Sequence, residues 1–98
     1  MNLNVFIESL HNAAPPNTSV YLKALWYDKK DNWKAAHDLV NDLENKQGAW
    51  LHAYLHRKEG DIWNADYWYN RAGRKRPNVS LQQEWEQLVN AFIIEAGA

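Results

Sequence analysis

Residues 53–72, AYLHRKEGDIWNADYWYNRA, carry the strongest structural signal in this sequence. At the centre of the stretch, Gly60 is suited to end one helix and Asp61 to cap the next. Beyond this break, Ala65 and Tyr69 are four residues apart and so fall on one helical face. The stretch therefore predicts two helices joined by a tight turn, with small side chains where the helices cross.

The same pattern occurs earlier in the chain at a constant shift. Each copy has a small residue, a tight turn, another small residue and a larger apolar residue, in the matched pairs Ala24/Ala53, Asp31/Gly60, Asn32/Asp61, Ala36/Ala65 and Val40/Tyr69. Alanine at a crossing allows two helix axes to approach closely. An internal repeat of this kind predicts two helix pairs of similar build.

Break and cap signals divide the rest of the chain into further helices. Pro15-Pro16 ends the first helix, Gly48 marks a break before the fourth, and Ser80 with Gln83 fits a capping box for the sixth. No run of alternating apolar residues suggests a strand. The sequence therefore predicts an all-α protein of five to six helices, at about residues 4–12, 20–29, 33–45, 49–59, 62–72 and 80–95.

The second copy resembles a tetratricopeptide repeat and the related Sel-type repeat. The matching residues are Ala53, Gly60, Asp61, Ala65, Tyr69, Ala72 and Pro77. The resemblance covers residues 47–78 well and residues 18–46 more weakly, since Asp31 stands where the family prefers glycine. It implies one domain over residues 1–98, a short α-α superhelix of stacked antiparallel helix pairs with capping helices at its ends. The sixth helix is expected to cover the exposed apolar edge of the second repeat.

In this family the first helices of the pairs form a concave face, or groove, and present the side chains that contact a ligand. The matching positions of this chain are Tyr21, Gln47, Trp50, Tyr54, Arg57 and Lys58. Aromatic side chains beside basic ones suit an acidic or C-terminal peptide, or a partner helix. We therefore expect a non-enzymatic protein-interaction module that binds a protein or peptide. Two alternatives are that the sixth or first helix fills this groove, and that an exposed aromatic face makes a homodimer.

The histidines raise the question of a metal site. His52 and His56 are one helical turn apart, and His37 or Asp61 adds a third ligand only if the fold brings it close. The repeat register points His52 and His56 into the helix pair, so we expect hydrogen-bonded interior histidines, no metal and no cofactor. No phosphate loop, nucleophile elbow or metalloprotease motif is present, so no enzymatic activity is expected. A metal-dependent or acid–base enzyme that uses these histidines is the remaining alternative.

Charge and composition limit the other partners. The net charge of −1 argues against nucleic acid, although basic residues cluster at the end of the fifth helix, at Arg71, Arg74, Lys75 and Arg76. This cluster complements the helix dipole and suits phosphate or an acidic partner. No apolar run is long enough to cross a bilayer, the N-terminus has no basic leader, and cysteine is absent. These features predict a cytoplasmic protein without a membrane partner.

Six tryptophans are many for a chain of 98 residues. Trp33 and Trp63 follow the two predicted tight turns at nearly equivalent positions. We expect both side chains to pack against a neighbouring helix and to hold the turns in place.

Overall fold

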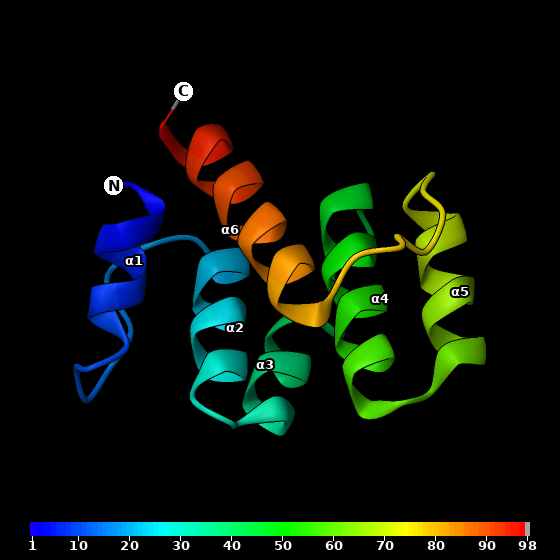
Figure 1. Cartoon of the computed structure of the whole chain (residues 1–98), viewed down its shortest axis with the longest axis horizontal. Helices are drawn as coiled ribbons and strands as arrows, with labels where there is room; N and C mark the ends of the chain where they lie inside the picture. The colour runs from blue at the N-terminus through cyan, green and yellow to red at the C-terminus, as the bar shows by residue number, and fades with distance from the viewer. Residues whose placement is uncertain (98) are drawn as a thin grey trace.

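The computed structural model describes residues 1–97, and the side-chain surroundings of residues 1–94. Within these residues the chain forms six α-helices and no strand, which confirms the predicted all-α class (Figure 1). The helices are α1 (Leu3–Ser9), α2 (Val20–Lys29), α3 (Trp33–Val40), α4 (Lys46–Glu59), α5 (Ile62–Arg71) and α6 (Leu81–Gly97). None of the helices in this part of the chain is long and apolar enough to span a membrane.

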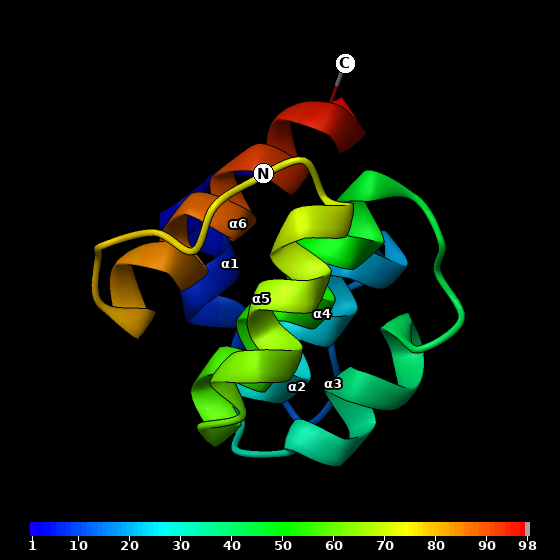
Figure 2. The same cartoon turned by 90° about the vertical axis from the view of Figure 1, so that its right-hand side faces the viewer.

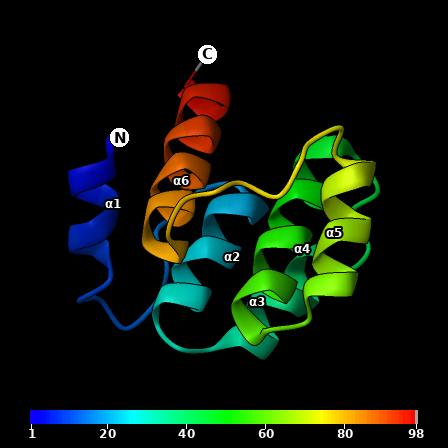
Figure 3. The ribbon, with the colours of Figure 1, turned by 45° about the vertical axis from the view of Figure 1, so that its right-hand side comes forward.

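Two antiparallel helix pairs, α2 with α3 and α4 with α5, form the body of the fold (Figure 3). The matched alanines are all fully buried, and these are Ala24, Ala36, Ala53 and Ala65. The turns inside the pairs are also alike, because Asp31 (φ 61°) and Gly60 (φ 90°) both adopt the left-handed backbone. Aspartate is one of the few residues besides glycine that tolerates this conformation. The two copies therefore share a turn geometry although their turn residues differ.

Helix α6 lies against the first helix of each pair. It packs on α2 and α4, and α1 packs against α6 in turn (Figures 1 and 3). Trp85 of α6 is fully buried, and its indole N–H donates to the Leu25 carbonyl at 3.1 Å. The Trp85 ring also lies 5.9 Å from the ring of Phe6 in α1. The sixth helix thus covers α4 of the second pair, whereas the outer face of α5 stays exposed (Figure 2).

The predicted break at Gly48 is wrong. Helix α3 ends at Val40, and α4 begins at Lys46, three residues earlier than predicted. Asn45 caps α4, because its Oδ1 accepts the Gly48 N–H at 2.9 Å. A Cβ atom at Gly48 would lie only 2.6 Å from the Leu43 Cβ. The glycine is therefore present because the incoming loop passes close to the first turn of α4, and not because a helix ends there.

Trp33 and Trp63 occupy different environments. The Trp33 indole N–H donates to the Leu55 carbonyl at 2.8 Å and so joins α3 to α4, as expected. The prediction for Trp63 is wrong, since this residue is 81% exposed on α5. In the repeat register Trp63 comes one residue later than Trp33, and one residue turns a side chain by about 100° around a helix. That rotation places the ring on the outer face of α5.

Candidate functional site

Helix α4 sends one row of side chains towards α2 and α6. The row consists of Trp50, Tyr54, Arg57 and Lys58. Successive members are four, three and one residues apart, so they lie along one side of the helix. Each side chain ends in a hydrogen-bond donor. Whether these donors are available to a partner depends on the acceptors that they bind within the chain.

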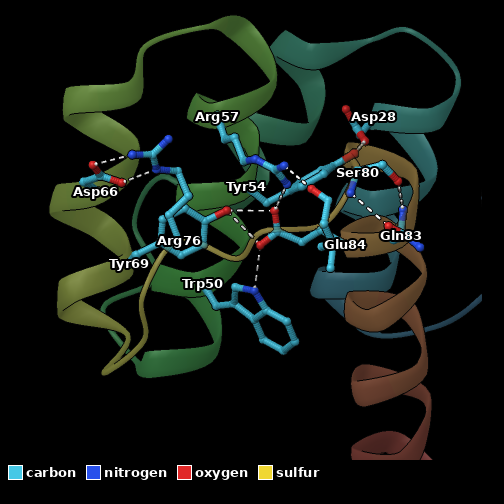
Figure 4. A network of polar contacts seen from close by, with 11 residues as sticks. Asp28, Trp50, Tyr54, Arg57, Asp66, Tyr69, Arg76, Ser80, Gln83 and Glu84 are labelled. Carbon is cyan, nitrogen blue, oxygen red and sulfur yellow. Dashed lines mark hydrogen bonds and ion pairs between the residues drawn. The ribbon is translucent and has the colours of Figure 1, made fainter.

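Donors from α4 and α5 converge on one buried carboxylate, Glu84 of α6 (Figure 4). Glu84 accepts the Tyr69 hydroxyl at 2.7 Å, Arg57 Nη1 at 2.8 Å and the Trp50 indole N–H at 3.2 Å. Arg57 also donates through Nη2 to the carbonyl of Val79, just before α6. A charge is stable inside a protein only when it is paired and hydrogen-bonded. These contacts therefore hold the start of α6 against α4 and α5.

A second buried carboxylate, Asp28 of α2, meets the other end of the same row. Its Oδ2 accepts the Tyr54 hydroxyl at 2.8 Å, and its Oδ1 accepts Lys58 Nζ at 2.8 Å. Lys58 also donates to the backbone carbonyl of Asp28 at 3.3 Å. Helix α4 is thus joined to α2 by one buried acid and to α6 by another.

Burial and these hydrogen bonds change the acid–base behaviour of two tyrosines. Burial, the charge of Asp28 and the hydrogen bond to it raise the pKa of Tyr54 far above its ordinary value. Burial and the hydrogen bond to Glu84 raise the pKa of Tyr69 in the same direction. Both hydroxyls therefore stay protonated, and remain donors, well above neutral pH.

Most of the predicted binding residues make their contacts inside the chain. Trp50 and Tyr54 are only 7% and 2% exposed, and the polar groups of Arg57 and Lys58 bind the two acids. The middle of the groove is filled by α6, which is one of the alternatives that the sequence left open. Tyr21 stacks on Phe92 of α6, with ring centroids 4.8 Å apart. Tyr54 is buried with its hydroxyl bound to Asp28 of α2, so its side chain is not accessible to a partner.

One end of the groove remains open. A pocket of about 260 Å³ lies there, lined by Lys46, Gln47, Trp50, Ala72, Arg74, Ala91 and Phe92. The guanidinium of Arg74 covers the Trp50 ring, 3.5 Å from its centroid. Neither Lys46 nor Arg74 forms an ion pair with any side chain in the described part of the chain. The pocket, here called the Trp50 pocket, therefore combines an apolar floor with two positive charges that pair with no carboxylate among residues 1–94.

The basic residues at the end of α5 divide into different roles. Arg76 pairs with Asp66 at 2.9 Å, and Arg71 donates to the Tyr67 hydroxyl at 3.0 Å. Arg74 alone among them lines the Trp50 pocket. A larger recess of about 510 Å³ lies beyond Arg74, lined by Asp66, Tyr69, Arg74, Lys75, Arg76, Pro77 and Asn78. Since the Asp66 carboxylate pairs with Arg76, Arg74 and Lys75 are the remaining basic groups of this recess.

The fold also brings His37 beside His52 and His56. The Nε2 atoms of His37 and His52 are 2.9 Å apart, and His56 Nδ1 lies 2.6 Å from a Glu59 carboxylate oxygen. His52 and His56 are buried and hydrogen-bonded, as the repeat register predicts. His37 meets the condition for a third ligand, because one ring nitrogen from each histidine lies within 4.8 Å of the others. His56, Glu59 and Asp61 form a second, more exposed group of potential ligands.

Sequence reasoning considered Asp28 as a ligand contact and Glu84 as a rejected acid–base partner of Glu86, and it did not predict that both are buried, although a signal is present. Glu84 is four residues before Leu88 and shares the buried face of α6 with it, and Asp28 is four residues after the buried Ala24. An acid on the apolar face of a helix requires donors from elsewhere in the fold. The spacing identifies such an acid, but it does not identify the helices that supply its donors.

Comparison of the chain with models of known protein families, with curated proteins and with solved structures finds no match. The fold and the groove define an all-α protein in which two helix pairs hold a helix of the same chain. The contacts described above are therefore the basis for any assignment of function.

We expect Glu84→Gln to destabilise the protein by about 3–5 kcal/mol, because it leaves the Arg57 charge without its buried partner. Urea unfolding followed by circular dichroism measures this loss. Glu86→Gln is the matched control on the same helix, since the Glu86 carboxylate binds only the exposed Gln82 amide, and we expect a change within about 0.5 kcal/mol. Equal stabilities for the two variants would show that the buried network does not hold α6 in place.

The raised pKa values of Tyr54 and Tyr69 predict a loss of stability in alkali. Both groups bind their protons more tightly when folded, so this contribution is complete below the ordinary tyrosine pKa of 10.0 and is lost as the pH rises above it. In an alkaline titration followed by tyrosinate absorbance, two of the five tyrosines should ionise only as helicity is lost. Tyr54→Phe should remove one of these late ionisations. Complete, reversible ionisation of all tyrosines with helicity intact would contradict the prediction.

Proposed function

We propose that the protein is a non-enzymatic interaction module that binds an acidic peptide segment in the Trp50 pocket. The observation that supports this most directly is the pair of cations, Lys46 and Arg74, that face an apolar floor and have no carboxylate partner among the described side chains. The two helix pairs fit a tetratricopeptide-like interaction scaffold. A cysteine-free chain also suits a cytoplasmic partner.

The pocket chemistry favours a carboxylate beside an apolar side chain. Trp50, Phe92 and Ala91 supply the apolar surface, and Lys46 and Arg74 supply the charge. Arginine bonds to carboxylate with two parallel N–H groups, and lysine adds a point charge. The site also lies at the N-terminal end of α4, where the helix dipole favours a negative group.

The Trp50 pocket has a volume of about 260 Å³ and lies open at one end of the groove. This volume accommodates one anchoring side chain together with a neighbouring carboxylate. Such an anchor, at the C-terminus or inside an acidic segment, is how short peptides gain both affinity and specificity.

The six expected binding residues then have three different roles. Gln47 and Trp50 line the pocket that receives the peptide. Tyr54, Arg57 and Lys58 hold the groove in shape through the buried acids. The role of Tyr21 is indirect, since it supports Phe92 from behind the pocket wall.

Self-association is a second candidate function, favoured by the outer face of α5. Trp63 is 81% exposed and Tyr67 is 46% exposed, and Arg71 follows four residues later. A two-fold axis at Tyr67 would place each Trp63 ring beside Arg71 of a second copy, which is a cation–π arrangement. Tryptophan, tyrosine and arginine are also the residues most enriched at the energetic centre of interfaces.

The peptide proposal is tested with a panel of fluorescein-labelled octapeptides, each with one large apolar residue, two acidic residues and a free C-terminal carboxylate. We expect saturable binding by fluorescence anisotropy that weakens with salt. Lys46→Gln and Arg74→Gln should each weaken binding about tenfold. Lys75→Gln makes the same charge change outside the pocket and should bind as wild type. Amidated peptides with Asn and Gln in place of the acids should not bind.

Two results would contradict this proposal. One is the absence of saturable binding by every acidic peptide in the panel. The other is unchanged binding by the Lys46→Gln and Arg74→Gln variants, with helicity confirmed by circular dichroism.

The self-association candidate predicts a concentration-dependent dimer. Light scattering after size-exclusion chromatography should show a monomer–dimer equilibrium for wild type, which Trp63→Ala shifts to monomer without loss of helicity. Ile94→Ala is the matched control, since Ile94 is 71% exposed on a different helix, and it should leave the equilibrium unchanged. A wild-type monomer at every concentration would rule out this candidate.

A further inference from the structure

Three imidazoles meet where α3 faces α4. His37 comes from α3, and His52 and His56 come from successive turns of α4. Two indoles flank the group: Trp33 stacks on His37 with ring centroids 4.8 Å apart, and Trp68 stacks on His52 at 4.0 Å. The stacked rings limit how far the imidazoles can rotate. The cluster is therefore built from both helix pairs and is held in place from two sides.

The ring nitrogens lie at distances that one metal ion can bridge. One nitrogen from each histidine is within 4.8 Å of the others, and the His37 and His52 Nε2 atoms are 2.9 Å apart. Two imidazole nitrogens on a tetrahedral zinc ion are about 3.3 Å apart, given a bond of about 2.0–2.1 Å. Side-chain movements of about 1.5 Å or less would close the set around an ion.

His52 supplies a second and independent observation. This residue is 3% exposed, and its Nδ1 has no hydrogen-bond partner among the described atoms. Polar atoms buried without a partner are rare because they destabilise the folded state. A metal ion bound at His52 Nδ1 would compensate for this burial, whereas an ion bound at the Nε2 that faces His37 would leave Nδ1 without a partner.

Two of the three rings, His37 and His52, have pKa values that favour the neutral form, which is the form that coordinates a metal ion. Burial, together with the neighbouring His37 and His56, lowers the pKa of His52 to about 4. Burial and the neighbouring His56 lower the pKa of His37 as well. Neutral imidazoles offer a lone pair to a metal ion without first releasing a proton.

Glu59 supports the third ligand from outside the cluster. Its carboxylate lies 2.6 Å from His56 Nδ1, which leaves the Nε2 of that ring for a metal ion. Carboxylates in this position behind a metal-bound histidine fix the ring orientation and increase its basicity.

We propose that His37, His52 and His56 form a binding site for a divalent transition-metal ion, with zinc as the preferred ion. Three imidazoles leave one coordination position for water or for a bound molecule, as in zinc sites that interact with substrates. Nitrogen ligands disfavour magnesium and calcium, which prefer oxygen. The competing location is the exposed group of His56, Glu59 and Asp61, which offers two oxygen ligands and a single imidazole.

The site is tested on the full chain, freed of metal and titrated with Co²⁺ as a spectroscopic probe. We expect one equivalent of Co²⁺ to produce the visible absorption bands of four-coordinate cobalt, and Zn²⁺ to displace it. His37→Gln removes one of the three ligands and should weaken Co²⁺ binding about tenfold or more. Since His37 is only half-buried, this replacement should leave the core intact. The control is His11→Gln, because His11 is the one histidine outside the cluster and is exposed. This variant should bind Co²⁺ as wild type does.

A second measurement needs no variant. In nitrogen-15 NMR spectra of the imidazoles, Zn²⁺ should shift the ring nitrogens of the three clustered histidines and not those of His11. Absence of cobalt bands and of ring shifts would overturn the proposal. So would a His37→Gln variant that binds as wild type while Asp61→Asn loses binding, since that result places the ion at the exposed group.

Discussion

The buried charge of Glu84 is the constraint on which the rest of the arrangement depends. A carboxylate with no access to water must receive donors from the protein, and here α4 and α5 provide them through Trp50, Arg57 and Tyr69. These donors come from different turns and different helices, so they all reach Glu84 in one position of α6 only. Apolar packing against α2 and α4 would tolerate small shifts of α6, whereas this network does not. The acid therefore sets the register of α6 in the groove.

Filling the groove determines where a partner can bind. With α6 in place, the middle of the α4 face serves the fold, and Tyr54 and Lys58 bind Asp28 in the interior. Two basic side chains, Lys46 and Arg74, do not bind the buried acids. They lie beside Trp50 at the N-terminal end of α4. The recognition site that we propose therefore lies at one end of the groove, beside the residues that keep α6 bound.

The sequence predicts those parts of the fold that depend on local signals. Caps, turns and the buried alanines identify both helix pairs. Asp31, which departs from the glycine that the family prefers, nevertheless adopts the same left-handed backbone as Gly60. Errors arise where a contact between distant segments decides the outcome. Gly48 resembles a helix break but makes room for Leu43. Whether the groove is open or filled depends on how α6 packs against α2 and α4. That packing depends on the hydrogen bonds between Glu84 and its donors, which no local sequence pattern predicts.

The two helix pairs are already joined by contacts other than the histidine cluster. Asp28 already ties α2 to α4, and the Trp33 indole ties α3 to the Leu55 carbonyl. A metal ion between α3 and α4 would repeat a connection that the fold has made by other means. Structural zinc sites are usually closed by four protein ligands, and domains that need the ion to fold lack such alternative contacts. Three ligands in an already connected fold therefore fit an ion that serves to hold a further molecule at its fourth position.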